Sequence, residues 1–280
     1  ALKPVQFGPV LGLAYLSVLT HPCLDWLNTY GIRLLMPFDG RWFYGDAVFI
    51  VDPWIWLLAG SAVVLAHTRS PSSIAAWVVP GTLLTLLVTG VNLVPVPAKV
   101  VWCGGVSLIV GVRVWGGLQH RIARVAALTL ASVVLYAGLM VTVSHLTRWR
   151  VERWLAAGTV APQQIMTGPV LANPFVRDVI VLDADHYHFL EVNWLAAERI
   201  RVSDESIPRE GRGPIIEAAL QAPHVQGLRT WMRFPSYEVE DLDDGYRVVI
   251  QDVRYSRAGP AGLGTAVVEL DLDLNLRQAD

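Results

Sequence analysis

Long apolar stretches fill the first half of the chain, whereas the second half mixes apolar and charged positions. A helix needs roughly 20 apolar residues to cross a bilayer core about 30 Å thick. Five stretches before residue 145 reach or approach that length, namely 7–20, 47–66, 74–94, 96–114 and 122–143. The pattern therefore predicts an α-helical integral membrane domain with about five membrane segments.

Two prolines indicate where helices of this domain begin. Pro22 has no backbone N–H for a continuing helix, so we expect the first segment to end or kink near Thr20 and a new helix to begin at Pro22. Asp52 followed by Pro53 is typical of an N-cap and the first helical residue. We therefore expect a helix to start at Pro53.

The composition changes after Ser144, where arginines follow the last apolar stretch. Strand-like runs at 176–182 and 186–192 flank an Asp-Ala-Asp turn, and two more runs flank Asp243-Asp-Gly245. Stretch 264–274 alternates like a half-exposed strand, whereas 214–222 and 225–233 have helical patterns. We predict a helical transmembrane domain over residues 1–146, followed by a small soluble α+β domain with a mostly antiparallel sheet over residues 147–280.

Composition agrees with a membrane protein and excludes some partners. Of 280 residues, 53% are hydrophobic and 16% are charged, so the lipid bilayer is the expected partner. The formal net charge of -2 provides no broad basic surface, which argues against nucleic acid as a partner. Cys23 and Cys103 have no spacing typical of a disulfide framework or a thiolate metal site.

His21 and Asp25 are the main candidates for chemistry. They lie four residues apart at the end of an apolar stretch, so in a helix they project from one face and can hold one cation. An alternative is that Thr20 or His21 caps a helix and Asp25 offsets its dipole. Ionisable residues at membrane depth are functional candidates by default, and both interpretations stay open here.

Asp46 and Asp52 fall near the same end of the first two segments as this pair. Two helices packed as a hairpin would gather the histidine and the three aspartates into one cluster, although a capping role would also explain Asp52. Nitrogen and oxygen ligands favour a divalent ion, zinc first and manganese second. Such an ion activates water for hydrolysis, which makes Asp25 and Asp52 the candidate catalytic residues.

Candidate substrate-binding residues follow the metal pair. Asn28 extends the polar stripe by one turn, and Arg33 and Arg41 could each grip a phosphate or carboxylate through two parallel donors. The alternative is an aromatic belt around Trp42 in which the arginines reach lipid headgroups. Further along, His186 and His188 alternate on one face of a predicted strand, which fits a metal pair but is more typical of an exposed sheet face.

The segment from His21 to Phe38, with Arg41-Trp-Phe-Tyr-Gly-Asp46 and Phe49-Ile-Val-Asp-Pro53, resembles the YdjM-type family of bacterial inner-membrane proteins, described as membrane-bound metal-dependent hydrolases. The resemblance implies a helical membrane domain, a metal centre and hydrolase chemistry. It implies that His21 and Asp25 are metal ligands, with Asp46 and Asp52 as further members of the site.

Other parts of the chain bear on the resemblance. Ala172-Asn-Pro-Phe175, Arg233-Phe-Pro235 and Arg254-Tyr255 are similar to the soluble tail of longer members. Members typically begin with a further helix pair that contains a His-Arg-Gly-x-Thr-His-Ser-like segment, which nothing in this sequence matches. We therefore expect the chain to lack the N-terminal part of the family pattern.

Two functional hypotheses result. The first is a multi-pass protein of the bacterial inner (cytoplasmic) membrane in which metal-activated water attacks a lipid-like ester or phosphoester. The alternative is a non-catalytic, membrane-anchored protein whose soluble domain binds a partner. A solute transporter is disfavoured, because transporter sites distribute polar residues through the midplane of several helices and here they gather near one end.

Overall fold

The computed structural model describes residues 6–68, 70–116, 121–158, 161–209, 213–255 and 262–277. The chain forms two compact units. The first comprises residues 1–150, 167–178 and 192–199, and the second comprises residues 151–166, 179–191 and 200–280. The predicted domain boundary after residue 146 stays a prediction.

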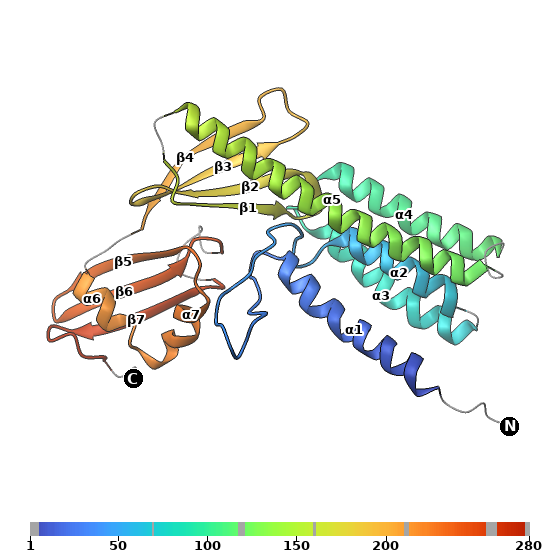
Figure 1. The fold of residues 1–280 in the computed structure, drawn as a ribbon, viewed down its shortest axis with the longest axis horizontal. Coiled ribbons are helices and arrows are strands. Elements are labelled where there is room, and N and C mark those ends of the chain that lie inside the picture. Colours follow the sequence, from blue (N-terminus) through green and yellow to red (C-terminus); the bar gives the residue numbers. More distant parts are fainter. Residues whose placement is uncertain are drawn as a thin grey trace. The chain divides into compact units, whose positions relative to one another are not determined.

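Five helices make up most of the first unit (Figure 1), namely α1 (Phe7–Leu27), α2 (Pro53–His67), α3 (Pro71–Gly90), α4 (Val96–Trp115) and α5 (Ile122–Ala157). Four of them, α1, α3, α4 and α5, are long and apolar enough to cross a membrane. The 15 residues of α2 span about 22 Å at 1.5 Å per residue, which is shorter than a bilayer core. The helical membrane domain is thus confirmed with four spans in the described chain, and the count of about five is not.

The predicted end of the first segment near Thr20 and the predicted new helix at Pro22 are wrong, because α1 continues through Pro22 to Leu27, whereas the kink stays a prediction. A proline inside a helix removes one N–H bond, here to the carbonyl of Val18, and prolines are more frequent in membrane helices than in soluble ones. One missing bond does not end a helix of 21 residues. His21 consequently lies inside a helix and not at the start of one.

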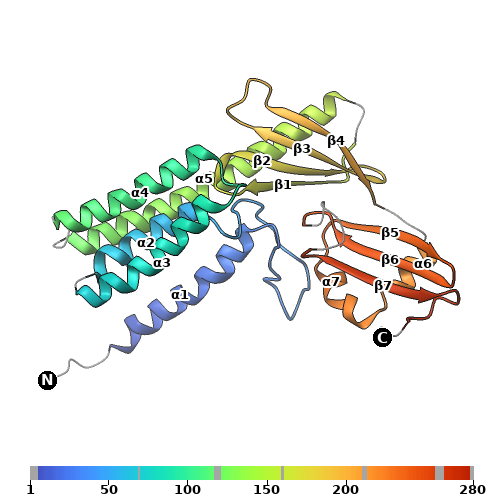
Figure 2. The same cartoon turned by 180° about the vertical axis from the view of Figure 1, so that it is seen from behind.

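Helices α2 to α5 run side by side in both views (Figure 1 and Figure 2), and α2 contacts α3 and α4. Trp102 of α4 is buried in a core with Val88, and its indole N–H donates to the hydroxyl of Thr85 at 3.2 Å. Arg113 of α4 donates from Nε to the carbonyl of Thr68 at 2.7 Å, which satisfies the C-terminal end of α2. Many outward leucines are exposed, as a lipid-facing surface requires.

Two antiparallel sheets follow, where the sequence predicted one. The first has the order β1 (Gln164–Val170), β2 (Asn173–Leu182), β3 (His186–Asn193), β4 (Ile200–Pro208), and the second has the order β5 (Pro235–Leu242), β6 (Gly245–Asp252), β7 (Thr265–Asp271). The sequence analysis missed β1 and β4. β1 contains a Gly-Pro pair, and the interior of β4 is polar and exposed, so neither shows the alternation that predicts a strand.

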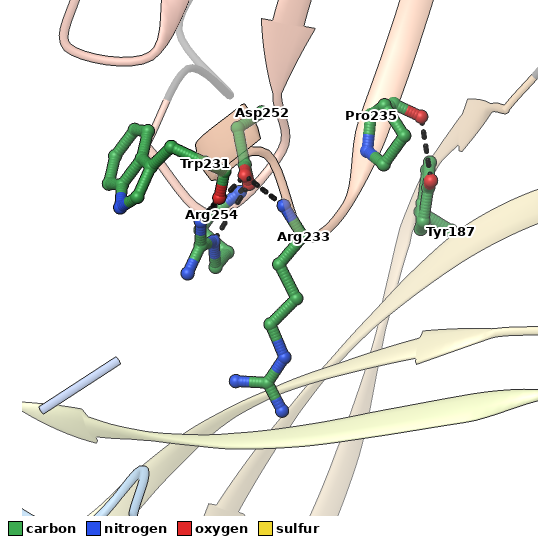
Figure 3. Close-up of polar contacts among 6 residues, drawn as sticks. All are labelled: Tyr187, Trp231, Arg233, Pro235, Asp252 and Arg254. Atoms are coloured by element: carbon green, nitrogen blue, oxygen red, sulfur yellow. Dashed lines mark hydrogen bonds and ion pairs between the residues drawn. The ribbon is translucent and has the colours of Figure 1, made fainter. Parts of the chain in front are cut away.

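Hydrophobic side chains join the elements of the second unit. The short helices α6 (Gly213–Ala219) and α7 (Gln226–Trp231), with a 3-10 turn at Pro223–Val225 between them, pack on β6 and β7 through Ile215, Val225 and Leu270. A separate core joins Tyr187 of β3 to Phe234, which precedes β5. The Tyr187 hydroxyl also donates to the carbonyl of Pro235 at 2.6 Å (Figure 3).

Candidate functional site

The last turns of α1 carry the pair that the sequence analysis placed first. His21 Nε2 lies 3.4 Å from Asp25 Oδ2, and the two side chains are 84% and 23% exposed. The hydroxyl of Tyr30 donates to the other oxygen of Asp25. The i, i+4 spacing therefore brings an imidazole nitrogen and a carboxylate oxygen together, and the hydrogen bond from Tyr30 orients the carboxylate.

The separation of these two atoms suits a shared ion. Zinc bonds of about 2.0–2.1 Å in a tetrahedral arrangement place neighbouring ligand atoms about 3.3–3.4 Å apart. His21 and Asp25 thus fit two positions of such an ion, whereas a catalytic zinc usually takes three protein ligands.

Asp52 lies at the start of α2, and both of its oxygens are engaged. Oδ1 accepts from the backbone N–H of Trp54 at 2.9 Å and of Ile55 at 3.2 Å. Oδ2 accepts from the hydroxyl of Tyr136 in α5 at 2.8 Å. The predicted N-cap is confirmed, and it holds α2 against α5.

Asp46 is buried in the loop before α2 and adopts a φ of 48°. Within the described residues, no three of His21, Asp25, Asp46 and Asp52 place ligand atoms close enough together to share one ion. The structure therefore brings His21 to Asp25 and leaves Asp46 and Asp52 outside that pair. The four-residue metal centre stays a prediction.

The loop over residues 28–52 folds back onto the end of α1. The backbone N–H of Gly45 donates to the carbonyl of Trp26 at 2.6 Å, and those of Ala47 and Val48 donate to the carbonyl of Leu27 at 2.9 and 3.0 Å. A Cβ at position 45 would lie 2.7 Å from the Trp26 oxygen, so only glycine fits there. The close backbone contact explains the glycine of the Tyr-Gly-Asp sequence.

Gly31 marks a second constraint in this loop. It adopts a φ of +79°, and a Cβ there would meet the Tyr44 ring at 2.4 Å. Glycine is the residue that reaches this backbone conformation without a steric penalty. The antiparallel bridge from Ile32 to Phe43 then closes the excursion of residues 33–42.

The three predicted substrate-binding residues each have intramolecular contacts. Asn28 is buried and donates to the carbonyl of Leu24 at 2.8 Å. Arg33 donates from Nε to the carbonyl of Gly40 at 3.0 Å, whereas the exposed Arg41 donates from Nε to Asp39 at 2.6 Å. Their role toward a substrate stays a prediction.

Arg177 of β2, which the sequence analysis missed, is the most deeply buried cation of the first unit's described residues. Its Nη1 donates to the carbonyl of Ala47 at 2.7 Å, and its Nη2 donates to the carbonyl of Met140 at 3.2 Å. Burial lowers the pKa of Arg177 to about 10, although Tyr136 and the carboxylates of Asp46 and Asp52 act in the opposite direction. Arg177 is therefore cationic at neutral pH and ties the loop before α2 to α5.

Sequence patterns offered a weak indication of these partners. Arg177 is one of two adjacent charged residues in a mostly apolar strand run, and Tyr136 carries a hydroxyl within an apolar helix. Either pattern is also common for exposed or interfacial residues. They are identified by contacts between residues far apart in sequence, Arg177 with Ala47 and Tyr136 with Asp52.

The Arg233-Phe-Pro and Arg254-Tyr patterns converge in the second unit on Asp252, whose side chain is fully buried (Figure 3). Arg254 donates from Nε and Nη2 to the two oxygens of Asp252 at 2.9 and 2.8 Å. The backbone N–H of Arg233 donates to the same carboxylate at 2.8 Å, while the Arg233 side chain extends away from it. Such a bidentate, fully buried pair organises the entry to β5 and the exit from β6.

Comparisons with known proteins agree with the membrane assignment. Residues 2–96 match the family model described as YdjM inner membrane protein, and this range contains His21, Asp25, Asp46 and Asp52. No curated protein matches the chain, and no solved structure matches it.

Proposed function

Because the chain is a multi-pass inner membrane protein with a YdjM family region at residues 2–96, we propose that it is a membrane-bound, metal-dependent hydrolase of esters or phosphoesters. The observation that carries the proposal is the His21–Asp25 pair, whose ligand atoms lie 3.4 Å apart at the end of a membrane-spanning helix. Two donors of this kind at this spacing fit a zinc or manganese ion.

The surroundings of Asp25 support a ligand role. The Tyr30 hydroxyl holds Oδ1, so Oδ2 faces His21 in a defined orientation. Hydrogen bonds to ligand side chains are the usual means by which a protein orients a metal site. When bound, a divalent ion supplies Lewis acidity, which makes water a usable nucleophile at neutral pH.

Residues in the following loop would position the substrate. Arg33 and Arg41 have guanidinium nitrogens beyond the Nε contacts described above, and guanidinium pairs with phosphate oxygens through parallel donors. Asn28 holds the end of α1 and so shapes the same region. Both oxygens of Asp52 accept hydrogen bonds within the protein, one from the start of α2 and one from Tyr136. Asp52 would therefore act by holding α2 in position against α5.

The substrate would be lipid-like, since the pair lies at the end of a helix that is long and apolar enough to cross the bilayer. The exposed apolar side chains of Leu34, Leu35, Met36 and Phe38 lie in the same loop as the two arginines. Apolar side chains beside cationic ones are typical of segments that contact the boundary between headgroups and acyl chains. A phosphoester with an acyl tail would contact both the apolar side chains and the arginines of this loop.

The test is metal content and hydrolysis of the purified full chain. We expect the His21→Ala/Asp25→Ala double variant to lose one equivalent of zinc or manganese by elemental mass spectrometry, and to lose metal-dependent hydrolysis of a p-nitrophenyl phosphoester in lipid vesicles. His145→Ala is the matched control, because His145 is an exposed histidine of α5 that should leave metal content unchanged.

Two results would overturn the proposal. One is equal metal content in the wild type and the double variant when both are folded by circular dichroism. The other is loss of metal without any hydrolysis by the metal-loaded wild type across ester and phosphoester substrates, which would leave a metal-binding protein that is not a hydrolase.

A further inference from the structure

The turn between β2 and β3 gathers two imidazoles and two carboxylates in the second unit. Asp183, Asp185 and His186 each offer one ligand atom, and the three atoms lie within 4.8 Å of one another. His186 Nδ1 is 2.9 Å from Asp185 Oδ1, and His188 Nε2 is 2.6 Å from Asp183 Oδ2. Because side chains two apart share a strand face, His186 and His188 meet the turn from the same side.

We propose that this turn is a divalent transition-metal site, with Asp183, Asp185 and His186 as ligands and His188 as the residue that positions Asp183. The site lies in the second unit and is independent of the His21–Asp25 pair, so it does not rest on the hydrolase proposal. A three-ligand set with water in the remaining positions is an ordinary composition for such an ion.

Asp183 has a free lone-pair position for the ion. Its Oδ1 accepts from the backbone N–H of Asp185 at 3.2 Å and of His186 at 2.8 Å. Its Oδ2 pairs with His188, and a carboxylate offers about four lone-pair directions in total. The three partners therefore fix the orientation of Asp183 and leave one direction for a metal.

The ligand types indicate which ion would bind. Two carboxylates and one imidazole form a harder set than the thiolates and multiple histidines of structural zinc sites. With bonds of about 2.1 Å, adjacent ligands of an octahedral ion lie about 3.0 Å apart, which is close to the 2.9 Å between His186 and Asp185. Mn²⁺ is therefore the probe of choice, with Zn²⁺ as the competitor.

A purely structural role explains Asp183 but not its neighbours. Asp183 caps the turn through two backbone N–H groups. The side chain of Asp185 is 71% exposed, and its described contact is His186, which is 43% exposed. Exposed pairs of this kind contribute little to stability, so the convergence of Asp185 and His186 on Asp183 favours a ligand role.

The experiment is a Mn²⁺ titration of the full chain in detergent, with free Mn²⁺ read by electron paramagnetic resonance. The reference chain and every variant of the turn carry His21→Ala/Asp25→Ala, so that Mn²⁺ bound at the His21–Asp25 pair does not contribute to the titration. We expect one Mn²⁺ per chain in that background, and at least a tenfold weaker affinity after adding His186→Ala. His188→Ala should weaken binding by about 10- to 100-fold, as loss of a hydrogen bond to a ligand does.

Asp185→Asn and His224→Ala complete the design. Asp185→Asn keeps the size of an exposed side chain and should weaken binding like His186→Ala, which covers the case in which the latter fails to fold. His224→Ala removes an exposed histidine of the same unit and should leave the titration unchanged. Absence of Mn²⁺ binding in the His21→Ala/Asp25→Ala background, or equal binding after Asp185→Asn, would overturn the site whatever happens to the hydrolase proposal.

Discussion

Arg177 is a buried cation that links the loop before α2 to α5 in the first unit. Its guanidinium reaches two backbone carbonyls, Ala47 before α2 and Met140 in α5, that are distant in sequence. Both are buried, so each carbonyl would lose a partner without it. The guanidinium holds donors on separate nitrogens in a fixed planar fork, whereas the ammonium group of lysine places its three donors on one nitrogen at the end of a flexible stem.

We therefore expect Arg177→Lys to lower the free energy of unfolding by about 2–3 kcal/mol, since hydrogen bonds to charged groups are worth about 1.5–3 kcal/mol. Thermal unfolding in detergent, followed by circular dichroism, measures the change. Arg201→Lys is the matched control in an exposed strand position, where the guanidinium contacts Glu191 at 3.8 Å. Equal unfolding midpoints for the two variants would show that Arg177 does not hold the unit together.

Asp183 makes the stability of the folded protein depend on pH. Burial raises the pKa of its carboxyl group, but hydrogen bonds from His188 and from the backbone of His186 and Asp185 outweigh burial and lower it. Its pKa is lowered in the folded protein, so the folded state is favoured above the ordinary pKa and loses this contribution as the pH falls through the lowered value. We expect Asp183→Asn to flatten the fall in unfolding temperature between pH 5 and pH 3, measured with a chelator present. Asp185→Asn is the control, because the described hydrogen bond of the Asp185 carboxylate is to the side chain of His186 and not to a backbone N–H. It should keep the wild-type dependence of unfolding temperature on pH. Identical slopes for Asp183→Asn and wild type would contradict the prediction.

The loop over residues 28–52 is the element that sets the surroundings of the candidate site. Gly45, Ala47 and Val48 bond to the last carbonyls of α1, and Ala47 packs with Leu27 and Met140. The loop is thereby held to α1 on one side and to α5 on the other. Arg33 and Arg41 lie in the part of this loop that the bridge between Ile32 and Phe43 closes.

Gly45→Ala tests the attachment. The added Cβ would lie 2.7 Å from the Trp26 carbonyl and 2.9 Å from Leu27 Cα, both backbone atoms that cannot rotate away. We expect a loss of about 1–3 kcal/mol and faster proteolysis within residues 28–52, because overpacking of this size forces backbone shifts. Gly138→Ala in α5 is the control, since nothing lies within 4 Å of its Cβ and alanine favours a helix. If Gly45→Ala resisted protease as well as the wild type, the contact of Gly45 with the end of α1 would not be what holds the loop.

Local sequence predicted some element boundaries and failed at others. The Asp52-Pro53 start of α2 was predictable, because an N-cap bonds residues two and three positions away. The continuation through Pro22 was not, since the cost of one lost bond depends on the rest of the helix. β1 and β4 were missed because their pairing to β2 and β3, and not their own alternation, makes them strands.

At the scale of the molecule, the contacts at the two ends of α2 show how far this short helix extends through the bundle. Trp54 at its start packs in the core that contains Val88 at the end of α3. Its other end, Thr68, accepts from Arg113 near the end of α4. The 15-residue helix α2 therefore reaches between the same two ends of the bundle as its long neighbours.

We predict that α2 does cross, which makes five crossings. In a background with Cys23→Ser and Cys103→Ser, single cysteines at Phe38→Cys and Ser72→Cys should react with a membrane-impermeant maleimide from opposite sides of the membrane. Both positions are exposed and flank α2. Labelling of both from one side, with full labelling of each after detergent, would instead establish four crossings.

The sequence by itself determined the membrane class, the order of helices before strands, and the His21–Asp25 pair. These follow from apolar runs and from i, i+4 spacing, which depend on neighbours within a few residues. Only the tertiary structure decided that Arg177 serves Ala47 and Met140, that Tyr136 serves Asp52, and that the second half contains two sheets. Those contacts join residues 37 to 130 positions apart, and no local pattern specifies which buried polar group will meet another across that distance.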